Sequence, residues 1–152
     1  MRRRKPHRGA ALLVVLVVVM VITVLALGFI ERSDMELACG NNVALKTRID
    51  YTAQGGLMWG RAVVLASPTM SFSPMNRQSF EAGTREYYDL VIGPADKNLP
   101  ADPNDTTYTR DIRVEAYKEL SDGSKVAQTW LQGLLHYDAA TGTGFYKRIQ
   151  RP

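Results

Sequence analysis

The residues of this sequence that could carry catalysis are few, and they are not arranged in a known catalytic pattern. His136 stands beside Tyr137 and Asp138 in a segment that predicts a strand, so a Ser-His-Asp arrangement can be drawn on paper. His7, the other histidine, lies in the basic stretch that opens the chain. The sequence has no Walker loop, no G-x-S-x-G elbow and no C-x-x-C pair. We therefore interpret His136 as an ordinary strand histidine and do not expect an enzyme.

A second group of residues could hold a metal ion. The connector "PADKNLPADPNDT" places several oxygen-bearing side chains at short spacing, namely Asp96, Asp102, Asn104 and Asp105. Oxygen ligands suit Ca²⁺, so Asp102, Asn104 and Asp105 form a candidate calcium site. The segment lacks the Gly and Glu of an EF-hand loop, and Asp and Asn also form turns, which is the favoured alternative. We expect no other metal and no cofactor.

Charge and cysteine content narrow the function classes. The formal net charge is +4, but the leader alone holds five basic residues, Arg2, Arg3, Arg4, Lys5 and Arg8. The rest of the chain is close to neutral, so the basic pI does not indicate a nucleic-acid partner. Cys39 is the single cysteine, which excludes an intrachain disulfide. We expect Cys39 to be a small buried residue on a helix face, and a disulfide between two chains is the alternative.

The basic leader is followed by a long apolar run, Gly9 to Ile30, in which Thr23 is the one polar side chain. A helix of roughly 22 residues is about 33 Å long, enough to cross a bilayer. Basic residues precede the run, and an acidic-rich stretch follows it. The positive-inside rule then predicts a cytoplasmic N-terminus with the bulk of the chain outside. A cleaved secretory signal cut near Ala26 or Gly28 is an alternative, although the run is long for one. A plain membrane anchor is the second alternative.

Beyond the apolar run the sequence still reads as a helix. Residues 31–66 contain no proline, and their apolar residues recur at three- and four-residue steps, as in an amphipathic helix. Gly55 and Gly56 are either weak points or close-packing positions. Pro68 is a stop signal. One helix is therefore predicted from about Ala10 to Ala66.

The composition changes at Ser67. Residues 67–84 read as a loop, and strands are predicted at 85–93, 107–120, 125–138 and 145–150, with a tight turn at Asp122-Gly123. The predicted fold class is α+β, with a long N-terminal helix packed on a C-terminal antiparallel sheet. The amphipathic half of the helix is the available cover for one sheet face. Trp59 and Trp130 are expected in the helix–sheet core or near the membrane, and an adhesive aromatic patch is the alternative.

The leader itself carries a family resemblance. "MRRRKPHRG" followed by "AALLVVLVVVMV" resembles the leader of a type IV prepilin. The resemblance implies that prepilin peptidase cuts between Gly9 and Ala10 and that Ala10 is then N-methylated. It also implies four parts: a leader (1–9), a transmembrane and assembly helix (10–30), its amphipathic continuation (31–66) and a sheet domain (67–152). The implied location is the inner membrane, and later an envelope filament.

One position departs from the usual pilin pattern. Most pilins carry Glu at the fifth mature position, where this chain has Val14. The opening resembles PilX-type minor pilins and the K-type minor pseudopilin of type II secretion, which also lack that Glu. "YTAQGGLMWGRA" further resembles the PilX-type N-terminal domain, through Ala53, Gly56 and Leu57. The implied function is a minor pilin or pseudopilin at or near a filament tip, with the membrane, prepilin peptidase and other subunits as partners. The alternative is a single-pass anchored binding domain that does not assemble.

Overall fold

The computed structural model of the protein describes residues 8–99 and 102–152. A helix, α1 (Arg8–Ala66), is followed by the strands β1 (Met75–Gln78), β2 (Glu86–Ile92), β3 (Asp96–Lys97), β4 (Thr107–Glu119), β5 (Lys125–Asp138) and β6 (Thr143–Gln150). The chain divides into two compact units, residues 1–43 and 44–152, and each is described by itself.

In the first unit, the described residues all belong to α1, and the side chains described there, from Ala11 onward, are exposed. This helix is long and apolar enough to cross a membrane, with a mean hydropathy of 3.3 in its most apolar stretch. Valine and isoleucine are tolerated in such a helix because every backbone group in lipid must be bonded within the segment. The structure therefore agrees with a membrane anchor, as the sequence predicts.

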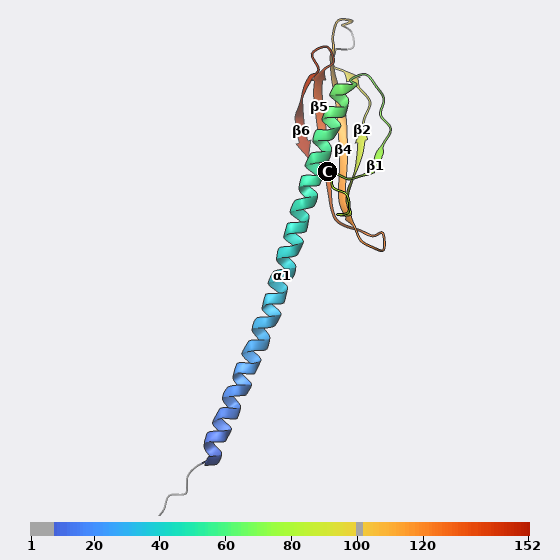
Figure 1. The fold of residues 1–152 in the computed structure, drawn as a ribbon. Coiled ribbons are helices and arrows are strands. Elements are labelled where there is room, and N and C mark those ends of the chain that lie inside the picture. Colours follow the sequence, from blue (N-terminus) through green and yellow to red (C-terminus); the bar gives the residue numbers. More distant parts are fainter. Residues whose placement is uncertain (1–7, 100–101) are drawn as a thin grey trace, which may run out of the picture. The chain divides into compact units, whose positions relative to one another are not determined.

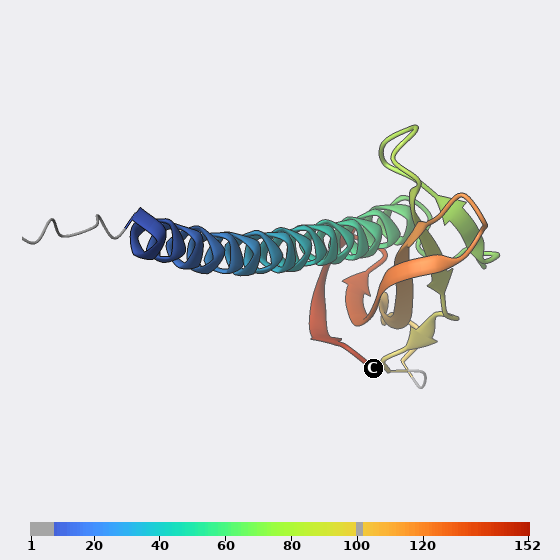
Figure 2. The ribbon, with the colours of Figure 1, turned by 90° about the horizontal axis from the view of Figure 1, so that it is seen from below.

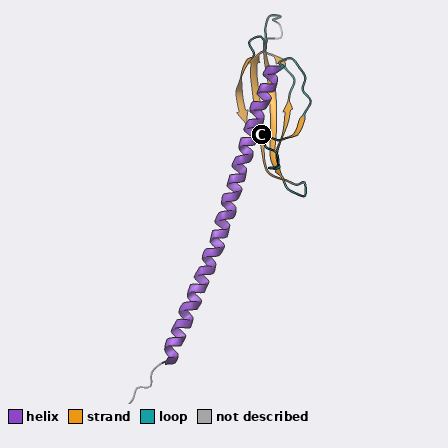
Figure 3. Ribbon diagram, in the orientation of Figure 1, coloured by secondary structure: helices purple, strands orange, loops and turns teal. Residues whose placement is uncertain are grey.

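The second unit contains one antiparallel sheet with the strand order β1-β2-β4-β5-β6 (Figures 1 and 3). β4 and β5 are the long central strands, and they pair from Thr107 opposite Asp138 to Glu119 opposite Lys125. The turn between them is the predicted one, with Gly123 at a φ of +84°. The pairing shifts by one residue near Ala127, which has a φ of +50° and forms a β-bulge in β5.

The last turns of α1 lie along one face of this sheet (Figures 1 and 2). Ile49, Ala53, Leu57 and Val64 are at most 1% exposed, and their spacing of four, four and seven residues keeps them on one side of the helix. They join a single core with the alternating inward residues of β2, β4 and β5, which include Leu90, Ile112, Val114, Leu131 and Leu135. The α+β fold and the helix that covers the sheet are as predicted.

Glycine permits the close approach of helix to sheet. A Cβ placed on Gly56 would lie 2.8 Å from Cγ1 of Val114, and one placed on Gly60 would lie 3.0 Å from Cγ2 of Ile112. Both distances are shorter than ordinary carbon contacts of about 3.5–4.0 Å. Of the two interpretations of the Gly55-Gly56 pair, close packing is the correct one at Gly56.

Two short strands were not predicted. The segment 67–84 was expected to be a loop, but it contains β1, whose burial is slight and whose register is irregular. β3 lies in the expected connector and pairs with β4 beyond the end of β2, at Asp96 opposite Thr109. Both strands depend on tertiary pairing to a longer neighbour rather than on their own pattern. β6 also begins earlier than expected, at Thr143.

Candidate functional site

The first unit contains an exposed apolar segment, residues 11–30. Leu12 is 73% exposed, Val14 60% and Phe29 71%, and no side chain from Ala11 to Ala44 is buried within the chain. Burying one such side chain is worth about 1.5–3 kcal/mol, so the whole segment is strongly driven out of water. The segment therefore needs a dry cover that the described part of the chain does not supply.

The predicted processing position lies at the start of this segment. Residues 1–7 of the expected leader fall outside the described residues. Gly9 and Ala10 lie in the first turns of α1, which begins at Arg8, and their side-chain surroundings are not described. The first turn of α1 holds no acidic residue. Val14, further along α1, is an exposed apolar side chain at the position where the resemblance expects Glu.

Cys39 and the two tryptophans differ from their predicted environments. Cys39 is exposed, not buried, because helix–sheet packing first involves Leu45, more than a turn further along α1. Trp59 is 50% exposed and Trp130 49%, so their placement in the helix–sheet core is wrong, whereas the alternative placement near the membrane stays a prediction. Trp59 is not on the side of α1 that packs against the sheet. Trp130 lies between two buried residues of β5, so its side chain is on the sheet face opposite the helix.

In the calcium candidate, the acidic side chains bind the connector itself. A carboxylate oxygen of Asp102 accepts from the backbone N–H of Asn104 at 2.9 Å. Asp105 accepts from the N–H of Leu99 at 2.8 Å and from the hydroxyl of Thr107 at 2.6 Å, which lowers the pKa of this carboxyl group. Among the described residues, no three His, Cys, Asp or Glu side chains gather to hold a metal ion. The geometry is that of turn-forming Asp residues.

His136 is placed as an ordinary strand histidine. Its Nδ1 lies 3.2 Å from the side-chain nitrogen of Asn98, and its ring packs against Phe145 at a centroid distance of 5.4 Å. Asp138 instead accepts from the hydroxyl of Thr106 at 2.6 Å, which lowers the pKa of its carboxyl group. The structure does not bring His136 and Asp138 into a catalytic hydrogen bond.

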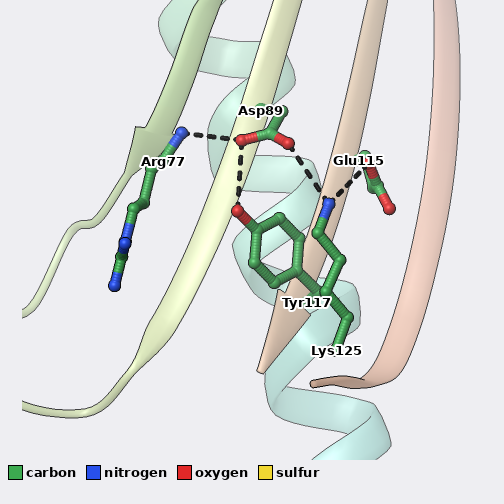
Figure 4. A network of polar contacts seen from close by, with 5 residues as sticks. All are labelled: Arg77, Asp89, Glu115, Tyr117 and Lys125. Atoms are coloured by element: carbon green, nitrogen blue, oxygen red, sulfur yellow. Dashed lines mark hydrogen bonds and ion pairs between the residues drawn. The ribbon is translucent and has the colours of Figure 1, made fainter. Parts of the chain in front are cut away.

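The sheet face opposite α1 carries a polar network that the sequence did not reveal (Figure 4). Asp89 accepts from the backbone N–H of Arg77 at 2.6 Å and from the hydroxyl of Tyr117 at 3.3 Å. Lys125 bridges Asp89 and Glu115 at 3.4 and 3.1 Å, and its ammonium lies 3.8 Å from the centre of the Tyr117 ring. The residues come from β1, β2, β4 and β5, so the network fastens four strands together.

A buried arginine is the other feature that sequence reasoning passed over. Arg110 is 2% exposed and lies on the helix-facing side of β4. Its guanidinium donates to the hydroxyl of Tyr137 and to three carbonyl oxygens, those of Pro68, Met70 and Gly93. The signal was present in the sequence, because Arg110 falls in phase with Ile112 and Val114, the apolar side of an alternating strand.

Arg110 also fixes the end of α1. Pro68 follows the last helical turn, and its carbonyl oxygen accepts from Arg110 at 2.9 Å and from Tyr137 at 2.6 Å. A cation beside the carbonyl end of a helix is favoured by the helix dipole. Arg110 thus connects β4, β5 and the segment that leaves α1.

The protein matches no family model, and neither a curated protein nor a solved structure is significantly similar to it.

Proposed function

We propose that this protein is a minor pilin or pseudopilin, a structural subunit that is processed by prepilin peptidase and assembled at or near the tip of an envelope filament. The observation that carries the proposal is the exposed apolar segment, joined in one continuous helix to a segment that packs on a sheet. A membrane is a dry environment for such a surface, and so is a bundle of similar helices. The same side chains can therefore serve as an anchor first and as a filament core later.

The charge pattern supports the orientation. The leader holds five basic residues before the apolar run, and the first acidic residue, Glu31, comes only after it. The positive-inside rule then retains the leader in the cytoplasm, where prepilin peptidase cuts, and places the sheet domain on the other side of the membrane.

Processing at Gly9 provides the test. Mass spectrometry of the protein from its native cell is expected to show a mature chain that begins with a methylated Ala10. Gly9→Leu is expected to leave the leader in place. Gly28→Leu is the matched control, because a Cβ at Gly28 has no neighbour within 4 Å and the change lies at the alternative signal-peptidase position. An intact leader in the native protein, or a mature chain that begins near Gly28, would contradict the proposal.

A single-pass anchored binding domain is the second candidate. It is favoured by Val14, because an apolar residue there suits lipid and removes one contact between subunits. The Gly9→Leu variant separates the two candidates. An anchored domain works normally with an uncut leader, whereas a pilin subunit stays in the membrane and does not enter filaments.

A further inference from the structure

Arg110 stands beside a cavity that nothing in the proposed function uses. The cavity has a volume of about 470 Å³ and is lined by Thr69, Ser71, Phe72, Ile92, the stretch Gly93-Pro94-Ala95 and Arg110. Its walls come from the chain after α1, from the end of β2 and from β4, all within residues 44–152. The volume lies within the range of roughly 300–1,000 Å³ that is usual for small-molecule pockets.

The charge of Arg110 has no counter-charge in the protein. Every Asp and Glu of the chain lies within the described residues, and none of them forms an ion pair with Arg110. Asp111, its neighbour in sequence, turns to the other face of the sheet and accepts there from Arg113 and Gln132. The four acceptors of Arg110 are neutral oxygens, so a buried unit charge remains uncompensated.

The guanidinium also retains donor capacity. It has five N–H groups, and four hydrogen bonds are formed: one from Nε, two from Nη2 and one from Nη1. One N–H of Nη1 is left without an acceptor among the described residues. The hydroxyls of Thr69 and Ser71 line the same cavity, and neither forms a hydrogen bond within the described part of the chain.

We propose that this cavity binds a monocarboxylate with a short apolar body. Guanidinium groups recognise carboxylates through charge-assisted hydrogen bonds, and a single negative charge balances the single charge of Arg110. The two hydroxyls can donate to the second carboxylate oxygen. Phe72, Ile92 and Pro94 offer apolar surface to the rest of the molecule. The residue Phe72 lies over the guanidinium, with 5.2 Å from Cζ of Arg110 to its ring centre, and shields this contact from water.

The test uses the full-length protein in detergent micelles, with butyrate as the probe. We follow the NMR signals of the Arg110 Nε–H group and of the Thr69 and Ser71 amides during titration at constant ionic strength. Saturable shifts with butyrate and none with butyramide, its uncharged analogue, are expected. Inorganic phosphate is expected to bind more weakly than butyrate, because its second charge has no partner here.

Three variants connect the shifts to the cavity without removing Arg110. Ala95→Phe fills the cavity and is expected to abolish binding. The double variant Thr69→Val, Ser71→Ala is expected to weaken binding by about tenfold, as hydrogen bonds to a charged group are lost. Arg113→Met removes an exposed arginine on the opposite sheet face and is expected to leave binding unchanged. No saturable shift, an equal response to butyramide, tighter phosphate binding or unaltered affinity in Ala95→Phe would each overturn the proposal.

Discussion

The hydroxyl of Tyr146 in β6 donates a hydrogen bond to the carbonyl oxygen of Leu57 in α1, at 2.5 Å. The ring of Tyr146 lies over Gly133, where a Cβ would come within 2.6 Å of it. Burial raises the pKa of the Tyr146 hydroxyl, and the charge of Arg61 offsets only part of that rise. This one side chain therefore holds the last strand to the helix, and it does so in its protonated form.

Replacing Tyr146 with Phe is expected to lower the free energy of unfolding by about 1 kcal/mol, the usual net value of one hydrogen bond. Denaturant unfolding of the full-length protein in micelles measures the change. Tyr51→Phe is the matched control, because Tyr51 is 68% exposed on the same helix, and it is expected to have no effect. Equal losses in the two variants would contradict the role of Tyr146.

The Tyr146 interaction also predicts a pH dependence. Its stabilisation is fully present below the unfolded pKa of about 10 and is lost as the pH rises through that value toward the raised folded pKa. The wild-type protein should therefore lose stability above this point, as denaturant midpoints across alkaline pH would show. Tyr146→Phe should lose less over the same range, and an unchanged alkaline slope would contradict the assignment.

Adjacent glycines in α1 should respond in opposite directions to alanine. A methyl group on Gly56 meets buried Val114, so overpacking of about 1–3 kcal/mol should exceed the gain of about 1 kcal/mol in helix propensity. A methyl group on Gly55 meets only the ring of Phe80, which is 57% exposed and stacks on Tyr88, so this ring can shift toward solvent at the cost of part of that stacking. Thermal unfolding should show a lower Tm for Gly56→Ala and an equal or higher Tm for Gly55→Ala. The same sign for both would show that close approach at Gly56 is unimportant.

The carboxylate of Asp138 is expected to make the stability of the fold depend on pH in the acid range. Three hydrogen bonds lower the pKa of its carboxyl group; they come from the hydroxyl of Thr106, the backbone N–H of Ala140 and the hydroxyl of Thr141. The resulting stability is present above the unfolded pKa of about 3.9 and is lost as the pH falls through the lowered folded value. Asp138→Asn should make denaturant midpoints less dependent on pH over that acid range. Asp96→Asn, at an exposed carboxylate, is the control and should keep the wild-type slope.

The sequence predicted those parts of the fold whose pattern is local and long. The helix from Ala10 to Ala66 and the hairpin at Asp122-Gly123 were recognised because periodicity and turn chemistry act over neighbouring residues. β1 and β3 were missed because they exist through pairing with β2 and β4. The environment of Trp59 was mispredicted for a related reason: a broad apolar pattern does not show which part of the helix meets the sheet.

The candidate sites also divide into those that a local sequence pattern identifies and those that only tertiary contacts create. Gly9, Ala10 and Val14 were identified from a linear motif, and their roles remain predictions that filament biochemistry must test. The cavity beside Arg110 was missed because its walls come from segments about 40 residues apart, as the Arg110–Pro68 hydrogen bond shows. The alternation of β4 does place Arg110 in phase with Ile112 and Val114, but this pattern alone does not show the cavity.

The last prediction concerns the position of the subunit in a filament. By the family resemblance, the N-terminal amine of one subunit pairs with the fifth-position Glu of a neighbour, and Val14 cannot accept such a pairing. On the proposed function, we expect the chain to dock through Ala10 onto subunits that carry the Glu and to be a poor acceptor for the next subunit, which would favour a tip position and low copy number. Val14→Glu restores an acceptor and should spread immunogold label along isolated filaments. Val15→Glu places the same charge about 100° around the helix and should not. Dense shaft labelling of the wild-type protein would refute this prediction.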